Sequence, residues 1–348
     1  MMEVQNFANN VIEYPQEFNY NINHPSLCLQ HTEVFLLVAI RTIFAHYDRR
    51  MAIRETWGSK HKYKGLQIPL VFMFGAMDNR DIQNSIEREN KIYKDIIQED
   101  FIDSDNNLTL KTAMSYKWAS KHCPHASYVM VANDNIIVDI FKLIPYLKSQ
   151  SPSADKFTVC NFQKCCEAPP QSRFLKSNYF KYYGRSEEVC SSDAYLAPIG
   201  VVDKLFQASL STPRFGPDQA WMGVVAREAG ITFQNTASAF VGIDDKTPVL
   251  KKFMGVDYLT SPAMIGVVGD EFLGKEATIM RHLWRIIQEH HTRMQLSSVY
   301  HAQFPSKSSD SSSVLVLAVS LMFVDLMVVV IIFLLIFCKK KHRRKVLH

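Results

Sequence analysis

The residues with the clearest capacity for chemistry are Asn133, Asp134 and Asn135, which directly follow the apolar run from Tyr128 to Ala132. An apolar run of strand length that ends in acidic or amide residues is how many α/β proteins place oxygen ligands at the carboxyl edge of a sheet. A divalent cation held there neutralises a diphosphate, and carboxylates are the ligands it prefers. Only Asp134 carries charge. The triplet therefore predicts a metal and nucleotide loop in which two neutral amides weaken the site.

The elements that position this triplet alternate between strands and helices. Apolar runs predict buried strands at residues 34–40 and 68–75 and a short one at 96–101, ahead of the strand at 128–132. Helical patterns are found at residues 49–58, 82–93, 108–122, 141–147, 218–230 and 276–291. This alternation predicts an α/β layered domain over residues 33–295. The sequence has no Gly-rich turn of the Rossmann or P-loop kind, so Rossmann-type dinucleotide binding is poorly supported and no phosphate-binding P-loop is found.

Four segments lie outside this domain. They are a polar lead-in at residues 1–32, a Ser-rich linker at 296–313, an apolar segment at 314–338 and a basic tail at 339–348. The apolar segment is long enough to cross a hydrocarbon core of roughly 30 Å and predicts a transmembrane helix. The tail predicts a cytoplasmic C-terminus, and hence a lumenal globular domain. Much of the net charge of +5 lies in this tail, so the charge gives no indication of nucleic-acid binding.

The route of the globular domain into a lumen stays open. Residues 1–30 lack the charged and apolar regions of a signal peptide, and the run at 34–40 is too short to span a bilayer. Either the true N-terminus is missing from this chain, or the protein is tail-anchored with its main domain in the cytosol. Of the seven cysteines, Cys338 belongs to the membrane boundary. The other six could pair in an oxidising lumen, with a connectivity that the sequence does not decide.

Three stretches, in this order, resemble the β-1,3-glycosyltransferases of family 31, the galactosyl- and N-acetylglucosaminyltransferases of the Golgi lumen. Residues 50–58 read Arg-x-Ala-Ile-Arg-x-Thr-Trp-Gly, which is typical of the family. Residues 95–112 end in Asn-Leu-Thr-Leu-Lys-Thr, like the family's own run. Residues 128–130 fall where the family's metal-bearing strand lies. The resemblance covers roughly residues 34–242 and marks the chain as a divergent member.

The resemblance implies a GT-A fold, which is a Rossmann-like mixed sheet flanked by helices. It also implies a Golgi membrane protein with a UDP-sugar donor, Mn²⁺ as cofactor and a glycan acceptor on protein or lipid. The implied reaction is an inverting transfer of galactose or N-acetylglucosamine to a sugar 3-hydroxyl. Such a transfer needs a neutralised diphosphate, a general base for the acceptor hydroxyl, and two sugars held in line.

The family's metal motif falls on residues 133–135, which gives Asp134 and Asn135 the metal-ligand positions and Asn133 a place in the donor site. The family has Asp where Asn133 and Asn135 stand. Arg50 and Arg54 share a helix face and suit a diphosphate, or else they are solvated charges or fold-internal ion pairs.

Two further residues, Asp103 and Lys111, are candidates for shaping the nucleotide pocket, with a structural salt bridge or helix cap as the alternative.

The family's catalytic Glu-Asp-Val motif falls on residues 218–220. Gln219 therefore stands at the position of the general base, and Asp218 is the neighbouring carboxylate that a small shift of the helix start would present. Residues 190–195 match the family's acceptor-side loop, Cys-Ser-Gly-Thr-Gly-Tyr, with both glycines replaced. Loss of those glycines predicts a reshaped loop if they provided positive φ or close approach.

Three hypotheses of function follow. The first is a membrane-bound, UDP-sugar-dependent hexosyltransferase of β-1,3 type. The second is a catalytically impaired pseudoenzyme of the same fold that binds or stabilises a partner, because charge is lost at Asn133, Asn135 and Gln219 together. The third is a tail-anchored cytosolic module with no role in sugar transfer.

Overall fold

The computed structural model describes residues 18–59, 62–104, 107–151, 155–165, 187–212, 214, 218–242, 249–269 and 272–303. The chain divides into two compact units, residues 1–291 and residues 292–348, and only residues 292–303 of the second are described. The predicted transmembrane segment and basic tail lie outside the described residues. Within the described ranges, no helix combines the length and the apolar character needed to cross a bilayer.

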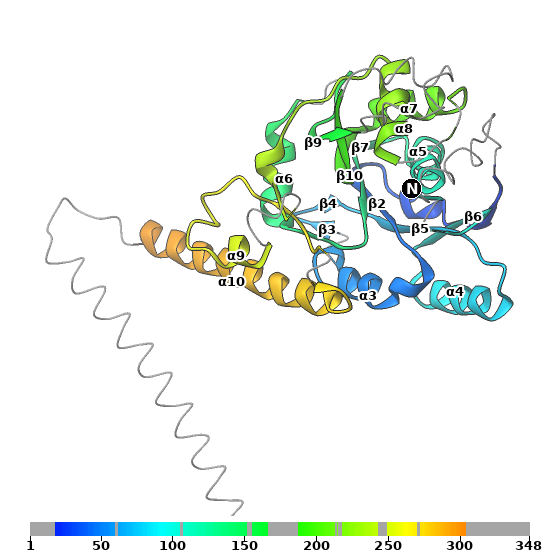
Figure 1. Ribbon diagram of the computed structural model, residues 1–348. Helices are drawn as coiled ribbons and strands as arrows, with labels where there is room; N and C mark the ends of the chain where they lie inside the picture. The colour runs from blue at the N-terminus through cyan, green and yellow to red at the C-terminus, as the bar shows by residue number, and fades with distance from the viewer. Residues whose placement is uncertain are drawn as a thin grey trace, which may run out of the picture. The chain divides into compact units, whose positions relative to one another are not determined.

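A seven-stranded mixed sheet forms the centre of the first unit (Figure 1). Its middle strands are parallel and lie in the order β6 (Ile96–Ile102), β5 (Leu70–Ala76), β2 (Val34–Arg41) and β7 (Ala126–Asn133). Antiparallel strands complete the sheet, with β1 (Tyr20–Ile22) beside β6, and β10 (Glu187–Pro198) and β9 (Val159–Cys165) beyond β7. The predicted mixed α/β architecture is confirmed, since strands buried on both faces require helices on both sides.

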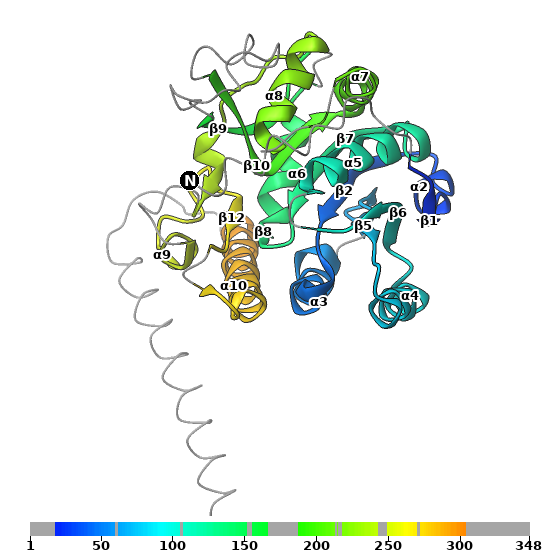
Figure 2. The same cartoon turned by 45° about the vertical axis from the view of Figure 1, so that its right-hand side comes forward.

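Helices cover both faces of this sheet (Figures 1 and 2). On one face are α3 (Tyr47–Glu55) and α4 (Arg80–Tyr93), and on the other are α5 (Leu108–His122), α7 (Ile199–Ser209) and α8 (Asp218–Glu228). Each face of the sheet has its own hydrophobic core, one under α3 and one under α5. Alternate residues of β2 belong to alternate cores, because successive side chains of a strand point to opposite faces. Leu36, Val38 and Ile40 pack in the α3 core, and Leu37 and Ala39 pack in the α5 core.

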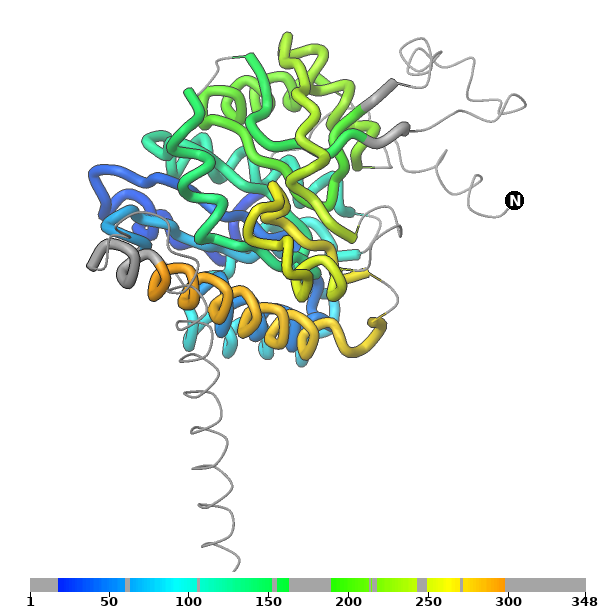
Figure 3. The backbone as a smooth tube through the Cα atoms, turned by 90° about the vertical axis from the view of Figure 1, so that its left-hand side faces the viewer, coloured from blue at the N-terminus to red at the C-terminus, as the bar shows by residue number. Residues whose placement is uncertain are grey.

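A second, three-stranded sheet continues directly from the loop at residues 133–135. Its strands lie in the order β11 (Phe240–Val241), β12 (Ile265–Val267) and β8 (Ile136–Val138). Beside it pack α6 (Ile140–Ser149), α9 (Val249–Met254) and the first part of α10 (Glu276–Gln303). Figure 3 shows the segment around α9 against α10, and His290 Nε2 lies 3.2 Å from the Phe253 carbonyl oxygen there. This sheet fixes the far side of the loop that carries Asp134.

The predicted lead-in at residues 1–32 contains two ordered elements, β1 and α2 (Ser26–Leu29). Long-range contacts order them, which local sequence does not reveal: β1 pairs with β6, and Cys28 forms a disulfide with Cys123. A second disulfide, between Cys160 and Cys190, joins β9 to β10. These two pairs among the described residues resolve part of the connectivity that the sequence left open.

Candidate active site

The candidate site lies at the carboxyl ends of β2 and β7, where the strand order reverses. From β2 the chain proceeds outward to β5 and β6, and α5 then returns it to β7 on the opposite side of β2. In open α/β sheets, ligands bind in the crevice at such a switch point. Arg41 and Asn133, the last residues of the two strands, are direct partners in the parallel register. Thr42 and Asp134 are therefore the first residues beyond the sheet.

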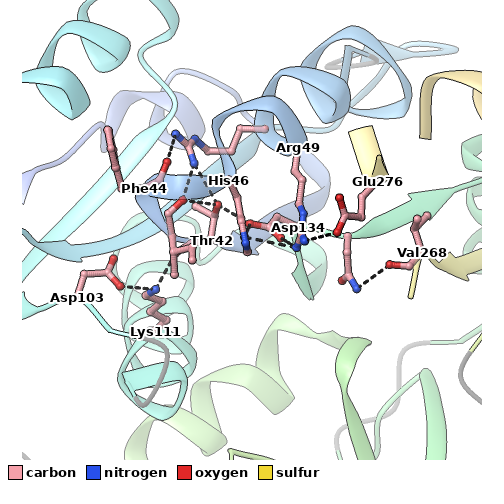
Figure 4. A network of polar contacts seen from close by, with 12 residues as sticks. Thr42, Phe44, His46, Arg49, Asp103, Lys111, Asp134, Val268 and Glu276 are labelled. Atoms are coloured by element: carbon pink, nitrogen blue, oxygen red, sulfur yellow. Dashed lines mark hydrogen bonds and ion pairs between the residues drawn. The ribbon is translucent and has the colours of Figure 1, made fainter. Parts of the chain in front are cut away.

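Asp134 is the centre of a polar network drawn in Figure 4. Its buried carboxylate accepts hydrogen bonds from Thr42 Oγ1 at 2.6 Å, from His46 Nδ1 at 2.8 Å and from Arg49 Nη1 at 3.2 Å. Burial alone would raise the pKa of Asp134, but the contacts with His46, Thr42 and Arg49 outweigh burial and lower it. Asp134 is therefore ionised at neutral pH, with both oxygens engaged.

Arg49 connects this network to a distant part of the chain. Its Nη2 lies 2.7 Å from Glu276 Oε1, while Nη1 contacts Asp134. Glu276 opens α10, where a carboxylate is also favoured by the helix dipole. The guanidinium of Arg49 thus sits between two carboxylates, and it joins α3, the β7 loop and α10.

Asp103 and Lys111 form a buried ion pair behind Thr42. Lys111 Nζ lies 2.6 Å from Asp103 Oδ1 and donates to the Thr42 carbonyl at 2.7 Å. The backbone N–H of Gly75 donates to Asp103 Oδ2 at 2.9 Å. Glycine is needed at position 75 because a Cβ there would lie 2.7 Å from the Phe101 carbonyl oxygen. The structure brings the two predicted residues together in the salt-bridge arrangement, which holds the Thr42 backbone at the site.

A second cluster surrounds the buried side chain of Arg41. Its Nη1 pairs with Asp218 Oδ2 at 2.5 Å and donates to Thr112 Oγ1 at 2.7 Å. Its Nη2 donates to Asn133 Oδ1 at 2.9 Å and to the Ser192 carbonyl. The Asp218 side chain is only 2% exposed. Asp218, predicted as a catalytic carboxylate, is thus buried inside the fold and paired with Arg41.

Gln219 is half-buried at the start of α8, where its Oε1 accepts from Ser192 Oγ at 3.5 Å. The neighbouring Asp193 is also half-buried. Its carboxylate accepts from Ser191 Oγ at 2.6 Å and from Asn133 Nδ2 at 3.5 Å. The acceptor-side loop predicted at residues 190–195 therefore meets the predicted donor loop through Asn133.

Arg50 and Arg54 are engaged in ion pairs within the fold. The fully buried Arg50 pairs with Glu89 through Nε at 2.8 Å and Nη2 at 2.7 Å. Arg54 pairs with Asp95 through Nε and Nη2, both at 2.8 Å, and also contacts Glu89 at 2.8 Å. This geometry corresponds to the fold-internal alternative, because the side chains of Arg50 and Arg54 are 0% and 9% exposed and each is held by carboxylates.

The predicted ligand pair Asp134 and Asn135 does not fit Mn²⁺ in this arrangement. Both oxygens of Asp134 accept hydrogen bonds, and Arg49 sets a positive charge beside them. Asn135 donates its amide to the Val268 carbonyl at 3.2 Å, and its Oδ1 is buried without a partner among the described residues. In the same ranges, no three His, Cys, Asp or Glu side chains gather as a metal site. Of the two predicted ligands, the oxygen without a hydrogen bond is therefore the neutral Oδ1 of Asn135, and one neutral oxygen is too few ligands for a hard divalent cation.

Six of the residues in the two clusters were not predicted from the sequence as parts of a site. One rule would have found two of them: Arg41 and Thr42 follow the apolar run at 34–40 just as the triplet follows its own strand. Asp193 lies inside a stretch that was singled out, at a position not flagged there. No local signal marks the remaining three, which reach the site through tertiary packing: His46, Arg49 and Glu276.

Comparisons with known proteins identify the family of this chain. A family model described as Galactosyltransferase matches residues 48–237. Human Beta-1,3-galactosyltransferase 1 is 34% identical over 232 residues, which cover 64% of this chain and 69% of that protein. Human Lactosylceramide 1,3-N-acetyl-beta-D-glucosaminyltransferase is 32% identical over 244 residues, covering 66% and 63%. A solved galactosyltransferase in complex with donor and acceptor sugar analogues is 11% identical, and the match covers 72% of this chain and 95% of that one. Its TM-score of 0.39 is too low to support an argument about the fold. The predicted family is confirmed: this chain belongs to the galactosyltransferases of glycosyltransferase family 31.

Proposed function

We propose that this protein transfers galactose or N-acetylglucosamine from a UDP-sugar to a glycan acceptor on protein or lipid, in β-1,3 linkage and with inversion. The observation that carries the proposal is the network of charged and polar side chains at the ends of β2 and β7, the edge at which α/β sheets bind their ligands. The names of the two human relatives support the sugars and the linkage. A GT-A arrangement of the mixed sheet accords with this chemistry.

In this proposal the diphosphate is stabilised by side chains of this network. His46 and Arg49 keep 30% and 19% of their side chains exposed, whereas Lys111 and Arg50 are buried. Arg49 supplies a positive charge and a planar set of donors, which suit phosphate oxygens. His46 supplies a further ring nitrogen beside it. This assignment explains how a donor is held although the predicted metal ligands do not fit Mn²⁺.

Calorimetric titration of the full-length protein in detergent with UDP, with and without Mn²⁺, tests the donor site. We expect UDP to bind in both conditions. Arg49→Gln should weaken binding about tenfold or more, since a hydrogen bond to a charged group contributes about 1.5–3 kcal/mol. Arg88→Gln, an exposed change on α4, is the matched control. Absence of UDP binding in both conditions would refute the donor assignment.

One observation favours the pseudoenzyme as a second candidate. Asp218 is tied to Arg41, and Gln219 is a neutral amide, so neither residue at the family's base position offers a free carboxylate. A pseudoenzyme would bind UDP and yet release none from UDP-galactose or UDP-N-acetylglucosamine. Turnover with β-linked galactoside or glucosaminide acceptors distinguishes the two candidates.

We also propose that the protein resides in the Golgi membrane with its globular domain in the lumen. The two disulfides among the described residues support this placement, because disulfides persist in oxidising compartments. The tail-anchored alternative puts the same domain in the cytosol. Protease treatment of intact vesicles separates them: a lumenal domain is protected until detergent is added, whereas a cytosolic one is digested at once.

A further inference from the structure

The carboxylates at this edge of the sheet differ in what neutralises them. Four lie within ion-pair distance of a Lys or Arg nitrogen: Asp103 at 2.6 Å, Asp134 at 3.2 Å, Asp218 at 2.5 Å and Glu276 at 2.7 Å. Asp193 differs, because its contacts within the described residues are with uncharged donors, Ser191 Oγ and Asn133 Nδ2. A carboxylate without a cationic partner is the one best able to take up a proton.

The position of Asp193 is set by strand pairing. β10 runs antiparallel to β7, and Ala194 lies opposite Ala132, so Asp193 stands next to the loop that begins at Asn133. The residue before it, Ser192, contacts Gln219 at the start of α8 through its hydroxyl. Asp193 therefore lies between the donor loop and the segment that the family uses for its base. Its partial exposure leaves it accessible to a substrate hydroxyl, which the buried Asp218 is not.

We infer that Asp193 is the general base of the transfer, a role that rests on the proposed function. Its carboxylate accepts the proton of the acceptor hydroxyl as that oxygen bonds to the anomeric carbon of the UDP-sugar. The bond between this carbon and the β-phosphate oxygen breaks, and its electron pair leaves with UDP. Asp193 then gives the proton to water. A carboxylate so placed replaces the basic group that Gln219 does not supply.

The test compares Asp193→Asn, Asp193→Glu and Asp193→Ala in the full-length protein. Three quantities are measured: UDP affinity, the donor KM, and kcat with UDP-galactose or UDP-N-acetylglucosamine and either a β-linked acceptor or water. We expect Asp193→Asn to lower kcat by about 100-fold or more, the usual share of a general base, with UDP affinity and KM within about threefold of wild type. Asp193→Glu should retain more of the rate than the amide. Asp203→Asn, an exposed change on α7, should leave all three quantities unchanged.

Added formate or azide separates catalysis from structure. If Asp193 is the base, these small anions should restore part of the rate of Asp193→Ala, whereas a residue that only shapes the loop gives no such rescue. A kcat of Asp193→Asn within threefold of wild type would overturn the inference, and so would a loss of UDP binding without rescue. A wild-type protein that binds UDP but turns over neither donor, even to water, overturns it too. A wild type that fails to bind UDP refutes the proposed function itself and the inference with it.

Discussion

Replacing Glu89 with Gln separates a structural role of Arg50 from a role in donor binding. Glu89 accepts three hydrogen bonds from guanidinium groups, two from Arg50 and one from Arg54, at 2.7–2.8 Å. Burial raises the pKa of Glu89, but the two arginines outweigh burial and hold it below the ordinary value. The amide removes the charge with little change of shape. Arg50, which is fully buried, then loses its counter-ion, whereas Arg54 keeps Asp95.

The expected cost is large. Removing one partner of a buried ion pair destabilises a protein by about 3–5 kcal/mol, because the remaining charge is buried and uncompensated. At about 2–4 °C per kcal/mol for a domain of this size, the unfolding temperature should fall by roughly 6–20 °C. Glu87→Gln, an exposed change on the same helix, should cost less than about 0.5 kcal/mol. The double variant Arg50→Met/Glu89→Met should be more stable than Glu89→Gln, since no unpaired charge remains at Arg50.

Thermal unfolding of the oxidised protein and UDP calorimetry are the two assays. We expect Glu89→Gln to unfold earlier while its UDP affinity at low temperature stays within about twofold of wild type. The stability difference should persist at neutral pH. It should shrink below pH 4.5, because a carboxyl with a lowered folded pKa loses its stabilising contribution as it protonates. An unchanged unfolding temperature together with a tenfold loss of UDP affinity would refute the reasoning and return Arg50 to the donor site.

Three further predictions concern other parts of the molecule. Replacing Cys28 and Cys123 with Ser should lower the free energy of unfolding by about 4.7 kcal/mol, and replacing Cys160 and Cys190 should lower it by about 3.6 kcal/mol, because the disulfides close loops of 95 and 30 residues. Denaturant titrations that give the reverse order would contradict this. Asn135→Asp should lower the free energy of unfolding by about 1–3 kcal/mol, since the variant loses the hydrogen bond to the Val268 carbonyl. Mn²⁺ should not restore its unfolding temperature, because Arg49 holds Asp134, and selective stabilisation of the variant by Mn²⁺ would contradict the poor fit to metal. Burial lowers the pKa of Lys142 to about 8, below its unfolded value of 10.5. The free energy of unfolding of wild type should therefore rise relative to that of Lys142→Met as pH increases from about 8 to 10.5, and a difference that does not change with pH would contradict the shift.

The fold was predictable where local pattern and burial coincide. The runs that became β2, β5 and β7 are apolar on both faces, and α5 was expected over the same residues that it occupies, 108–122. The ordered segment at residues 20–29 was not predictable, because a pairing with β6 and a disulfide to Cys123 hold it in place from far along the chain. The helix α10 was expected to end at residue 291, where its apolar pattern ends, but it continues to Gln303, and residues 292–297 of this continuation are exposed.

The candidate site divides along the same line. Asn133, Asp134 and Asn135 could be predicted as site residues from their place at the end of a strand, because polar residues that follow a buried strand lie at the edge of the sheet. Which charges they meet is decided elsewhere. Arg49 and Glu276 are 227 residues apart in the chain, and their contact with Asp134 depends on how α3 and α10 pack. Residue type alone also gave Arg50 and Arg54 two readings that only their buried carboxylate partners distinguish.

The neutral side chain of Asn133 links the two halves of the site. Asn133 accepts a hydrogen bond from Arg41 and donates one to Asp193, a double role that an amide fills and an ionised carboxylate does not. The Asp that the family has at this position would face Asp193 with like charge across 3.5 Å, the present distance between the two side chains. It would also compete with Asp218 for Arg41. The loss of charge at Asn133 and the presence of a carboxylate at Asp193 are therefore one coupled arrangement. At this edge the carboxylate therefore stands on the acceptor-side strand, at Asp193, and the donor loop offers it the neutral amide of Asn133 as a hydrogen-bond donor.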